Sequence, residues 1–130
     1  MNIIVDTGPL VALLDRSDPL HAWAVKTLSP LSAPWLVCEA VLTETSHFLG
    51  DSRALRQAWR SGELVVALAA EQHRDRLAAL LDKYAPMDFA DACVVAMAEL
   101  HDPATVVTID RKDFSRYRIF GRRQIRAIMP

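Results

Sequence analysis

The sequence lacks an excess of charge of either sign. Its 130 residues include 15 Lys and Arg against 16 Asp and Glu, which gives a formal net charge of −1 at pH 7. The chain therefore lacks the large excess of basic residues that is typical of nucleic-acid-binding proteins. The low hydrophobicity and high net charge of disordered chains are absent too, because 52% of the residues are hydrophobic. The composition is that of an ordinary globular protein, and the length fits one domain, residues 1–130, with one core.

The sequence also lacks long apolar runs and paired cysteines. The longest apolar stretch, residues 90–100, is interrupted by Asp91 and Glu99, whereas a bilayer span needs about 20 apolar residues. The first residues carry no basic segment followed by an apolar one, so we expect neither a secretion signal nor membrane association. Cys38 and Cys93 belong to no CxxC or Cys/His cluster, which excludes a zinc motif and a disulfide scaffold. Buried free thiols in a reducing cytoplasm are the better interpretation.

Segments that favour strands alternate with segments that favour helices. Apolar runs predict strands at 3–5, 35–38, 63–68 and 105–109, and a final short strand at 117–120. Periodicity and capping residues predict helices at 9–14, 18–28, 39–49, 51–62, 71–84 and 88–101. This order is typical of an α/β domain in which helical layers cover a central, mostly parallel sheet of four to five strands. Sites in such domains lie outside the carboxyl ends of the strands.

Two of the predicted strands end in an aspartate. Asp6 follows residues 3–5, and Asp110 follows residues 106–109. If both strands are parallel, both carboxylates emerge at the same edge of the sheet. Thr108 shares a side of its strand with Asp110, so its hydroxyl is expected to bond near that residue. Taken singly, either aspartate is better explained as a helix cap, because Asp is a good N-cap.

Glu44 and Asp91 are two further acids in apolar surroundings. Glu44 lies three residues after Val41 and four before Phe48, which places it on their helix face. An acid there is costly unless it is paired, protonated or bound to a cation. The alternative is an acid at the edge of the apolar stripe that reaches solvent. Asp91 is the third residue of a helix that Asp88 would cap, where it also interacts with free amides and the helix dipole.

Four acids at strand ends or on the following helices suggest that they converge. Carboxylates packed together repel one another, and hard divalent cations such as Mg²⁺ or Mn²⁺ relieve that repulsion with oxygen ligands. Such a site suits phosphate esters, because the cation orients the phosphate, activates water and stabilises the leaving oxygen.

The four acids lie in segments that resemble the motifs of PIN domains. These segments are Asn2–Thr7 (NIIVDT), Val41–Thr45 (VLTET), Met87–Ala96 (MDFADACVVA) and Thr108–Phe114 (TIDRKDF). Each motif is weak alone, but the ordered set of four spans nearly the whole chain.

This resemblance implies a three-layer α/β/α nuclease fold and RNA cleavage that depends on Mg²⁺ or Mn²⁺. It maps Asp6, Glu44, Asp91 and Asp110 onto the catalytic acids of the family. Asp6, Asp91 and Asp110 would be metal ligands, and Glu44 a ligand or a base. Asp91 is preferred over the neighbouring Asp88 because it matches the position of the motif before Ala92. Asp113 would be either an additional ligand or a group that supports the ligands. Many small prokaryotic members are VapC-type toxins that form homodimers and are inhibited by a cognate VapB antitoxin. The resemblance therefore implies RNA, a VapB-like antitoxin and a second copy of the chain as partners.

The positive charge of the chain is concentrated at its end. Residues 111–130 hold seven Lys and Arg against one Asp, whereas residues 1–110 hold eight against 15 acids. Tyr117 and Phe120 interleave with these bases, a pattern that favours single-stranded RNA. A solvated surface that balances acids elsewhere is the alternative. The residues predicted to contact RNA, because they follow Asp110 closely, are Arg111, Arg118, Arg122 and Arg123.

Two other functions fit parts of the pattern. A different Mg²⁺-dependent phosphate enzyme is one, but a haloacid-dehalogenase phosphatase needs a second aspartate where Gly8 stands. An inactive PIN-fold module that binds RNA or protein is the other, and the presence of all four acids argues against it.

Overall fold

The computed structural model describes all 130 residues. Its central sheet has five strands in the order β3–β2–β1–β4–β7, and every neighbouring pair is parallel. The strands are β1 (Asn2–Val5), β2 (Trp35–Val37), β3 (Leu64–Val66), β4 (Ala104–Val107) and β7 (Ala127–Ile128). The parallel sheet of four to five strands expected from the sequence is thus confirmed.

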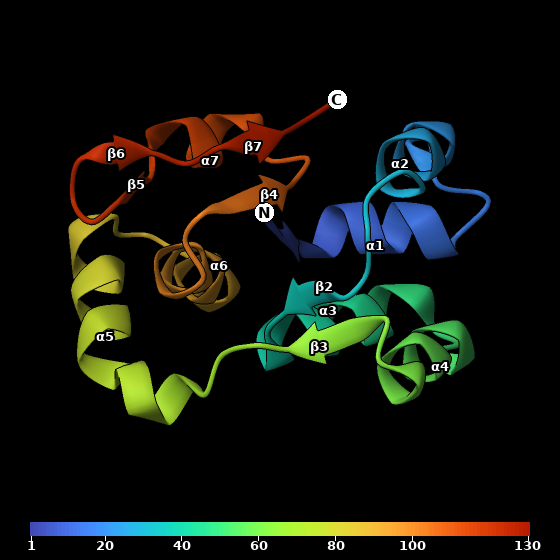
Figure 1. Ribbon diagram of the computed structural model, residues 1–130, viewed down its shortest axis with the longest axis horizontal. Helices are drawn as coiled ribbons and strands as arrows, with labels where there is room; N and C mark the ends of the chain where they lie inside the picture. Colours follow the sequence, from blue (N-terminus) through green and yellow to red (C-terminus); the bar gives the residue numbers. More distant parts are fainter.

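Helices cover both faces of this sheet. Four follow the first two strands and lie together on one side: α1 (Thr7–Leu14), α2 (His21–Leu28), α3 (Glu39–Leu49) and α4 (Arg53–Ser61). On the other side lie α5 (Arg74–Lys83), which a 3₁₀ segment over Ala70–His73 precedes, and α6 (Phe89–Leu100) (Figure 1). Right-handed crossovers produce this division, because the chain steps outward from β1 to β3 and then returns to β4. The three-layer α/β/α architecture is confirmed.

The most buried elements lie at the centre of the molecule. Ile4 and Val5 of β1 have no exposed surface, as expected for a parallel strand covered on both faces. On α6, eight of the 12 residues are buried, and the helix packs against both β1 and β4. The first turn of α6 is therefore held next to the carboxyl ends of these two strands.

The two helix ends marked by glycine fall where the sequence predicts them, but two helices begin later than expected. Gly50 and Gly62 end α3 and α4 with positive φ angles of 72° and 86°, as glycine allows. The helix expected from residue 71 begins as α5 only at Arg74, after the 3₁₀ segment. The helix expected from residue 18 begins only at His21. Asp18 instead accepts a hydrogen bond of 2.8 Å from the backbone N–H of Leu20, which closes a turn before the helix rather than capping it.

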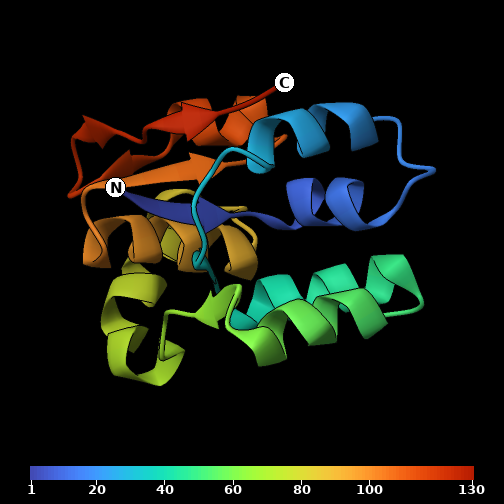
Figure 2. The same cartoon turned by 45° about the vertical axis from the view of Figure 1, so that its right-hand side comes forward.

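The last twenty residues differ most from the sequence expectation. The strand expected over 105–109 ends at Val107, and an unpredicted helix, α7 (Arg111–Arg116), follows. The segment 117–120 contains β5 (Arg118–Ile119), which pairs with β6 (Arg123–Gln124) in a separate antiparallel sheet. Figure 2 shows this hairpin at the end of the molecule away from α1 and α2. These elements are two to six residues long, which is too short to leave a periodic pattern.

The remaining expectations concern the cysteines and the membrane. Both cysteines are buried free thiols, as the sequence predicts. No helix combines the length and the apolar character that crossing a bilayer requires.

Candidate active site

The carboxyl ends of the strands form the floor of an acidic pocket of about 420 Å³. Twelve residues line it, and none of them is Lys or Arg. All four acids singled out from the sequence are among them, so the structure brings together residues that lie up to 104 positions apart. The carboxylates that line the pocket are Asp6, Asp18, Glu44, Asp88, Asp91, Asp110 and Asp113.

Asp6 lies at the end of β1 and caps α1. Its Oδ1 accepts a hydrogen bond of 2.9 Å from the backbone N–H of Thr7, and its Oδ2 accepts one of 2.8 Å from the hydroxyl of Thr108. Burial raises the pKa of Asp6 above its usual range, although these two hydrogen bonds oppose the shift. Asp6 therefore caps α1 and lines the acidic pocket at the same time.

Asp110 does not end its strand, because it follows Val107 by three residues and caps α7. It accepts a hydrogen bond of 3.0 Å from the backbone N–H of Asp113. Its own N–H donates to the hydroxyl oxygen of Thr108 at 3.1 Å. The predicted link between Thr108 and Asp110 is present, and the same hydroxyl also donates to Asp6.

Asp91 lies in the first turn of α6, beside the residue that caps the helix. Asp88 accepts the capping hydrogen bond from the N–H of Ala90 at 2.7 Å, which leaves Asp91 free of the helix backbone. Its Oδ2 accepts a hydrogen bond of 2.8 Å from the hydroxyl of Tyr117. Burial raises the pKa of Asp91 to about 7, and the nearby charges of Asp6, Asp88 and Asp110 add to the shift while the hydrogen bond opposes it.

Three of the carboxylates form a compact group. One oxygen from each of Asp91, Asp110 and Asp113 lies within 4.8 Å of the other two. Two oxygens bound to one Mg²⁺ are at most about 4.2 Å apart, so a small side-chain adjustment would let this group hold a single ion. The donors are all carboxylate oxygens, which suits a hard cation such as Mg²⁺ or Mn²⁺. Asp6 lines the same pocket but is not a member of this group.

Glu44 lies at the border between the pocket and solvent. Its Oε1 accepts a hydrogen bond of 2.7 Å from the hydroxyl of Thr7. The expectation that its helix face is buried is only partly right, because Val41 is buried but Phe48 is 65% exposed. Phe48 lines the pocket beside Glu44, so this face of α3 forms part of the wall of the pocket.

Sequence reasoning missed two features of the wall. Asp18 reaches the pocket from the turn before α2, and an Asp-Pro pair carries no signal that separates such a role from an ordinary turn. The other feature is the close approach of Gly8 and Ile109. A Cβ atom on Gly8 would lie 2.6 Å from Cδ1 of Ile109, so a larger residue at position 8 would require the 42% exposed side chain of Ile109 to move.

The structure separates the four predicted RNA-contacting arginines. Arg111 begins α7 next to Asp110 and donates a hydrogen bond of 2.7 Å to the carbonyl of Pro130. Arg118 donates to the carbonyl of Ser115 at 2.8 Å, at the end of the same helix. Arg123 forms an ion pair with Asp102, just beyond the end of α6.

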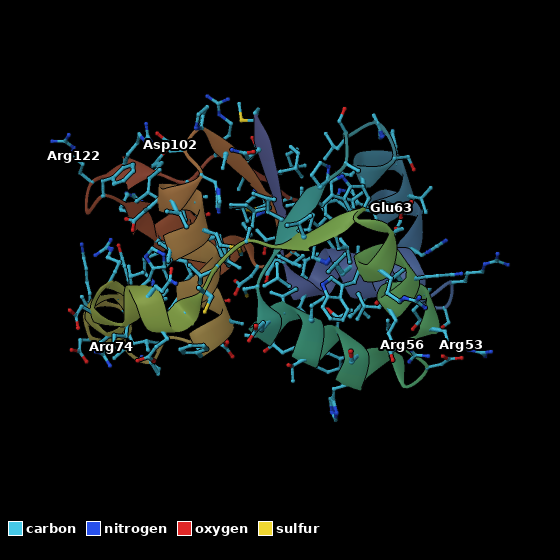
Figure 3. The ribbon with its side chains drawn as sticks, turned by 60° about the horizontal axis from the view of Figure 1, so that its bottom comes forward. Arg53, Arg56, Glu63, Arg74, Asp102 and Arg122 are labelled. Atoms are coloured by element: carbon cyan, nitrogen blue, oxygen red, sulfur yellow. The ribbon has the colours of Figure 1, made fainter.

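Arg122 and Asp102 lie together at one end of the molecule in Figure 3. Asp91 is at the other end of α6, a helix of 12 residues and therefore about 18 Å long. The structure thus does not bring Arg122 and Arg123 to the pocket. Their contact with RNA stays a prediction.

The fold and the pocket together define a class of protein: a three-layer α/β/α domain whose strand ends carry a carboxylate cluster suited to a divalent cation. The family model for the PIN domain matches residues 3–119. The chain therefore belongs to the PIN-domain family. PIN nucleases generally use a divalent metal, and the group of Asp91, Asp110 and Asp113 could bind one.

The chain is also similar to a curated relative. It is 28% identical over 128 residues to "Ribonuclease VapC26" of Mycobacterium tuberculosis (strain ATCC 25618 / H37Rv). The similarity covers 92% of this chain and 94% of the relative. The two proteins therefore match over almost their whole length.

Proposed function

We propose that this protein is a metal-dependent endoribonuclease and the toxin of a VapBC-type toxin–antitoxin pair. The observation that carries the proposal is the convergence of Asp91, Asp110 and Asp113 within 4.8 Å at the strand ends. The PIN family match and the full-length similarity to a protein named as a VapC ribonuclease support the choice of RNA as substrate.

Mg²⁺ or Mn²⁺ would be held by Asp91, Asp110 and Asp113, and Asp6, which lines the same pocket, would be a further ligand. When bound, such an ion lowers the pKa of water and neutralises the phosphodiester and the leaving oxygen. The pocket needs this neutralisation because seven carboxylates and no Lys or Arg line it. RNA is repelled from the pocket unless a cation is present.

Glu44 would accept the proton of the attacking water. Its Oε1 is engaged by the hydroxyl of Thr7, which restrains the carboxylate at the pocket that Glu44 lines and leaves Oε2 without a hydrogen bond, as a base requires. Asp6 is held by Thr7 and Thr108, so its orientation does not depend on substrate. Attack on phosphorus with departure of the 3′ oxygen would give products with 5′-phosphate and 3′-hydroxyl ends.

We further propose three macromolecular partners: RNA, a VapB-like antitoxin and a second copy of this chain. The name of the relative supports the antitoxin. Large apolar side chains on the surface support protein contacts, notably Phe48 at 65% and Trp59 at 52% exposure. Arg111 is the predicted RNA contact that lies nearest the pocket. Arg118, Arg122 and Arg123 would bind RNA farther from the scissile bond.

Cleavage of a mixed RNA substrate by Asp91→Asn protein tests the proposed function. We expect the wild type to cleave RNA in Mg²⁺ or Mn²⁺ and to stop in chelator, and Asp91→Asn to lose at least about 100-fold in rate. Asp82→Asn is the matched control, because Asp82 is an exposed aspartate of α5 outside the pocket. Cleavage that survives both chelator and Asp91→Asn would contradict the proposal.

A further inference from the structure

Tyr117 directs a buried hydroxyl group at the acidic cluster. Its side chain is almost fully enclosed, with 1% of its surface exposed. Its hydroxyl donates a hydrogen bond of 2.8 Å to Oδ2 of Asp91. The family motifs found in the sequence do not include this residue, which lies after the last of them. The sequence suggested only that it stacks on RNA bases, which its burial excludes.

The ring of Tyr117 is held rigidly by its neighbours. It packs edge to face against Tyr84 and against Phe114, with ring centroids 5.1 Å apart in both pairs. Its backbone N–H donates to the carbonyl of Asp113 at 3.0 Å, which ends α7. A donor fixed in this way holds its acceptor in one orientation without a large loss of side-chain entropy on bonding.

The hydrogen bond between Tyr117 and Asp91 connects the two helices that carry the three carboxylates. Asp91 belongs to the first turn of α6, whereas Asp110 and Asp113 belong to the start of α7. Tyr117 closes α7 and contacts Asp91, so it links the helix that carries two of the carboxylates to the third. Because one oxygen of Asp91 is engaged by the hydroxyl, the other oxygen remains available to the cluster.

We propose that Tyr117 is a positioning residue that orients the Asp91 carboxylate toward a cation shared with Asp110 and Asp113. The inference rests on the proposed metal site. Groups that hydrogen-bond to metal ligands fix ligand orientation, and their loss typically weakens metal binding by about 10-fold or more.

Tyr84 provides a matched control for the loss of a single buried hydroxyl. It is also buried, with 7% of its surface exposed, and its ring packs on Tyr117. Its hydroxyl accepts a hydrogen bond of 3.0 Å from the backbone N–H of Arg118 and touches no carboxylate. Tyr84→Phe and Tyr117→Phe therefore remove the same atom from the same aromatic cluster, and only the second change affects Asp91.

The test is equilibrium Mn²⁺ binding to the full-length protein, followed by electron paramagnetic resonance of the free ion. We expect Tyr117→Phe to bind Mn²⁺ about 10-fold more weakly and Tyr84→Phe to bind it like the wild type. In cleavage assays, Tyr117→Phe should need more Mn²⁺ for half-maximal rate while its rate at saturating Mn²⁺ falls much less. Placing p-aminophenylalanine at position 117 keeps a donor at the same place and should restore the affinity.

Three results would overturn the inference. Unchanged Mn²⁺ affinity in Tyr117→Phe would show that the hydroxyl does not position Asp91. Equal weakening in both tyrosine variants would show a packing effect, and the melting temperature of metal-free protein would reveal it. A wild type that binds no Mn²⁺, or that binds it equally well after Asp91→Asn, would remove the proposed metal site itself and with it the role of Tyr117.

Discussion

Thr108 donates a hydrogen bond of 2.8 Å to Asp6 across the boundary between two parallel strands, although the two residues are 102 positions apart in the chain. The same hydroxyl accepts a hydrogen bond from the N–H of Asp110. One buried side chain thus links the end of β1 to the segment between β4 and α7. These are two of the segments that carry the acidic pocket.

Replacement of Thr108 by valine should destabilise the protein and disturb the pocket. The change leaves a buried carboxylate oxygen and a backbone N–H without partners, which costs about 1–3 kcal/mol. Denaturant unfolding of metal-free protein measures this loss. Thr105→Val is the control, because Thr105 is buried on β4, the strand that precedes Thr108, and its hydroxyl donates a hydrogen bond only to the sulfur of Met1. Equal unfolding midpoints for the two variants would contradict the role assigned to Thr108.

The stability of metal-free protein should fall as the pH rises from about 4 to 7. The pKa of Asp91 is raised from 3.8 to about 7 in the folded state, so the native state binds a proton that the unfolded chain releases. Its stabilising contribution is therefore fully present below pH 3.8 and is lost through pH 7. Thermal unfolding of Asp91→Asn should show a flatter pH profile than the wild type, and an unchanged profile would count against the assigned shift.

Addition of Mn²⁺ should reverse this pH trend. Metal binding requires the ionised carboxylate, so the rise in melting temperature caused by Mn²⁺ should grow as the pH increases past 7. The comparison of melting temperatures with and without Mn²⁺ at pH 5 and pH 8 measures it. A stabilisation by Mn²⁺ that is the same at both values would mean that the ion binds elsewhere.

Gly8→Ala should force Ile109 away from its position on the wall of the pocket. The added Cβ would lie 2.6 Å from two side-chain atoms of Ile109. Because this side chain is 42% exposed, it can turn aside at a cost of about 1 kcal/mol. The double variant Gly8→Ala/Ile109→Ala removes the clash. The free energies of unfolding of the two changes should therefore be non-additive, and additive losses would show that Ile109 does not restrict position 8.

The arginines at the far end of α6 should affect RNA binding more than cleavage. Replacement of Arg122 and Arg123 by alanine is expected to weaken the binding of long RNA and to flatten its salt dependence, because each neutralised phosphate of a single strand adds about 0.7 to the slope. Arg111→Ala, close to Asp110, should also slow the cleavage of short RNA. Binding measured over a range of salt concentrations checks both effects, and an unchanged slope in the double variant would exclude these two residues.

The sequence was most informative where long elements position single residues. The positions of Asp6 and Asp91 could be predicted because each lies at the end of a strongly apolar element. The continuously apolar β1 and the almost entirely apolar α6 are both buried, so the carboxyl end of the strand and the first turn of the helix meet at one edge of the sheet. Gly50 and Gly62 marked helix ends correctly because a positive φ favours glycine.

Features that depend on tertiary contacts could not be predicted in this way. The bond between Tyr117 and Asp91 joins residues on different elements, and Asp18 enters the pocket from a turn. The nearness of Arg122 and Arg123 to Asp110 in the chain suggested nearness in space, but α7 and β5 carry the chain to the far end of α6. Short elements set by non-local pairing leave too little pattern to reveal such a path.

One ion shared by Asp91, Asp110 and Asp113 is the central feature of the proposed site. A crystal of the protein grown with Mn²⁺, analysed by anomalous scattering from manganese, locates that ion. We expect a peak about 2–2.5 Å from an oxygen of each of these three carboxylates. A manganese peak elsewhere in the pocket that contacts neither Asp91 nor α7 would contradict the proposed site.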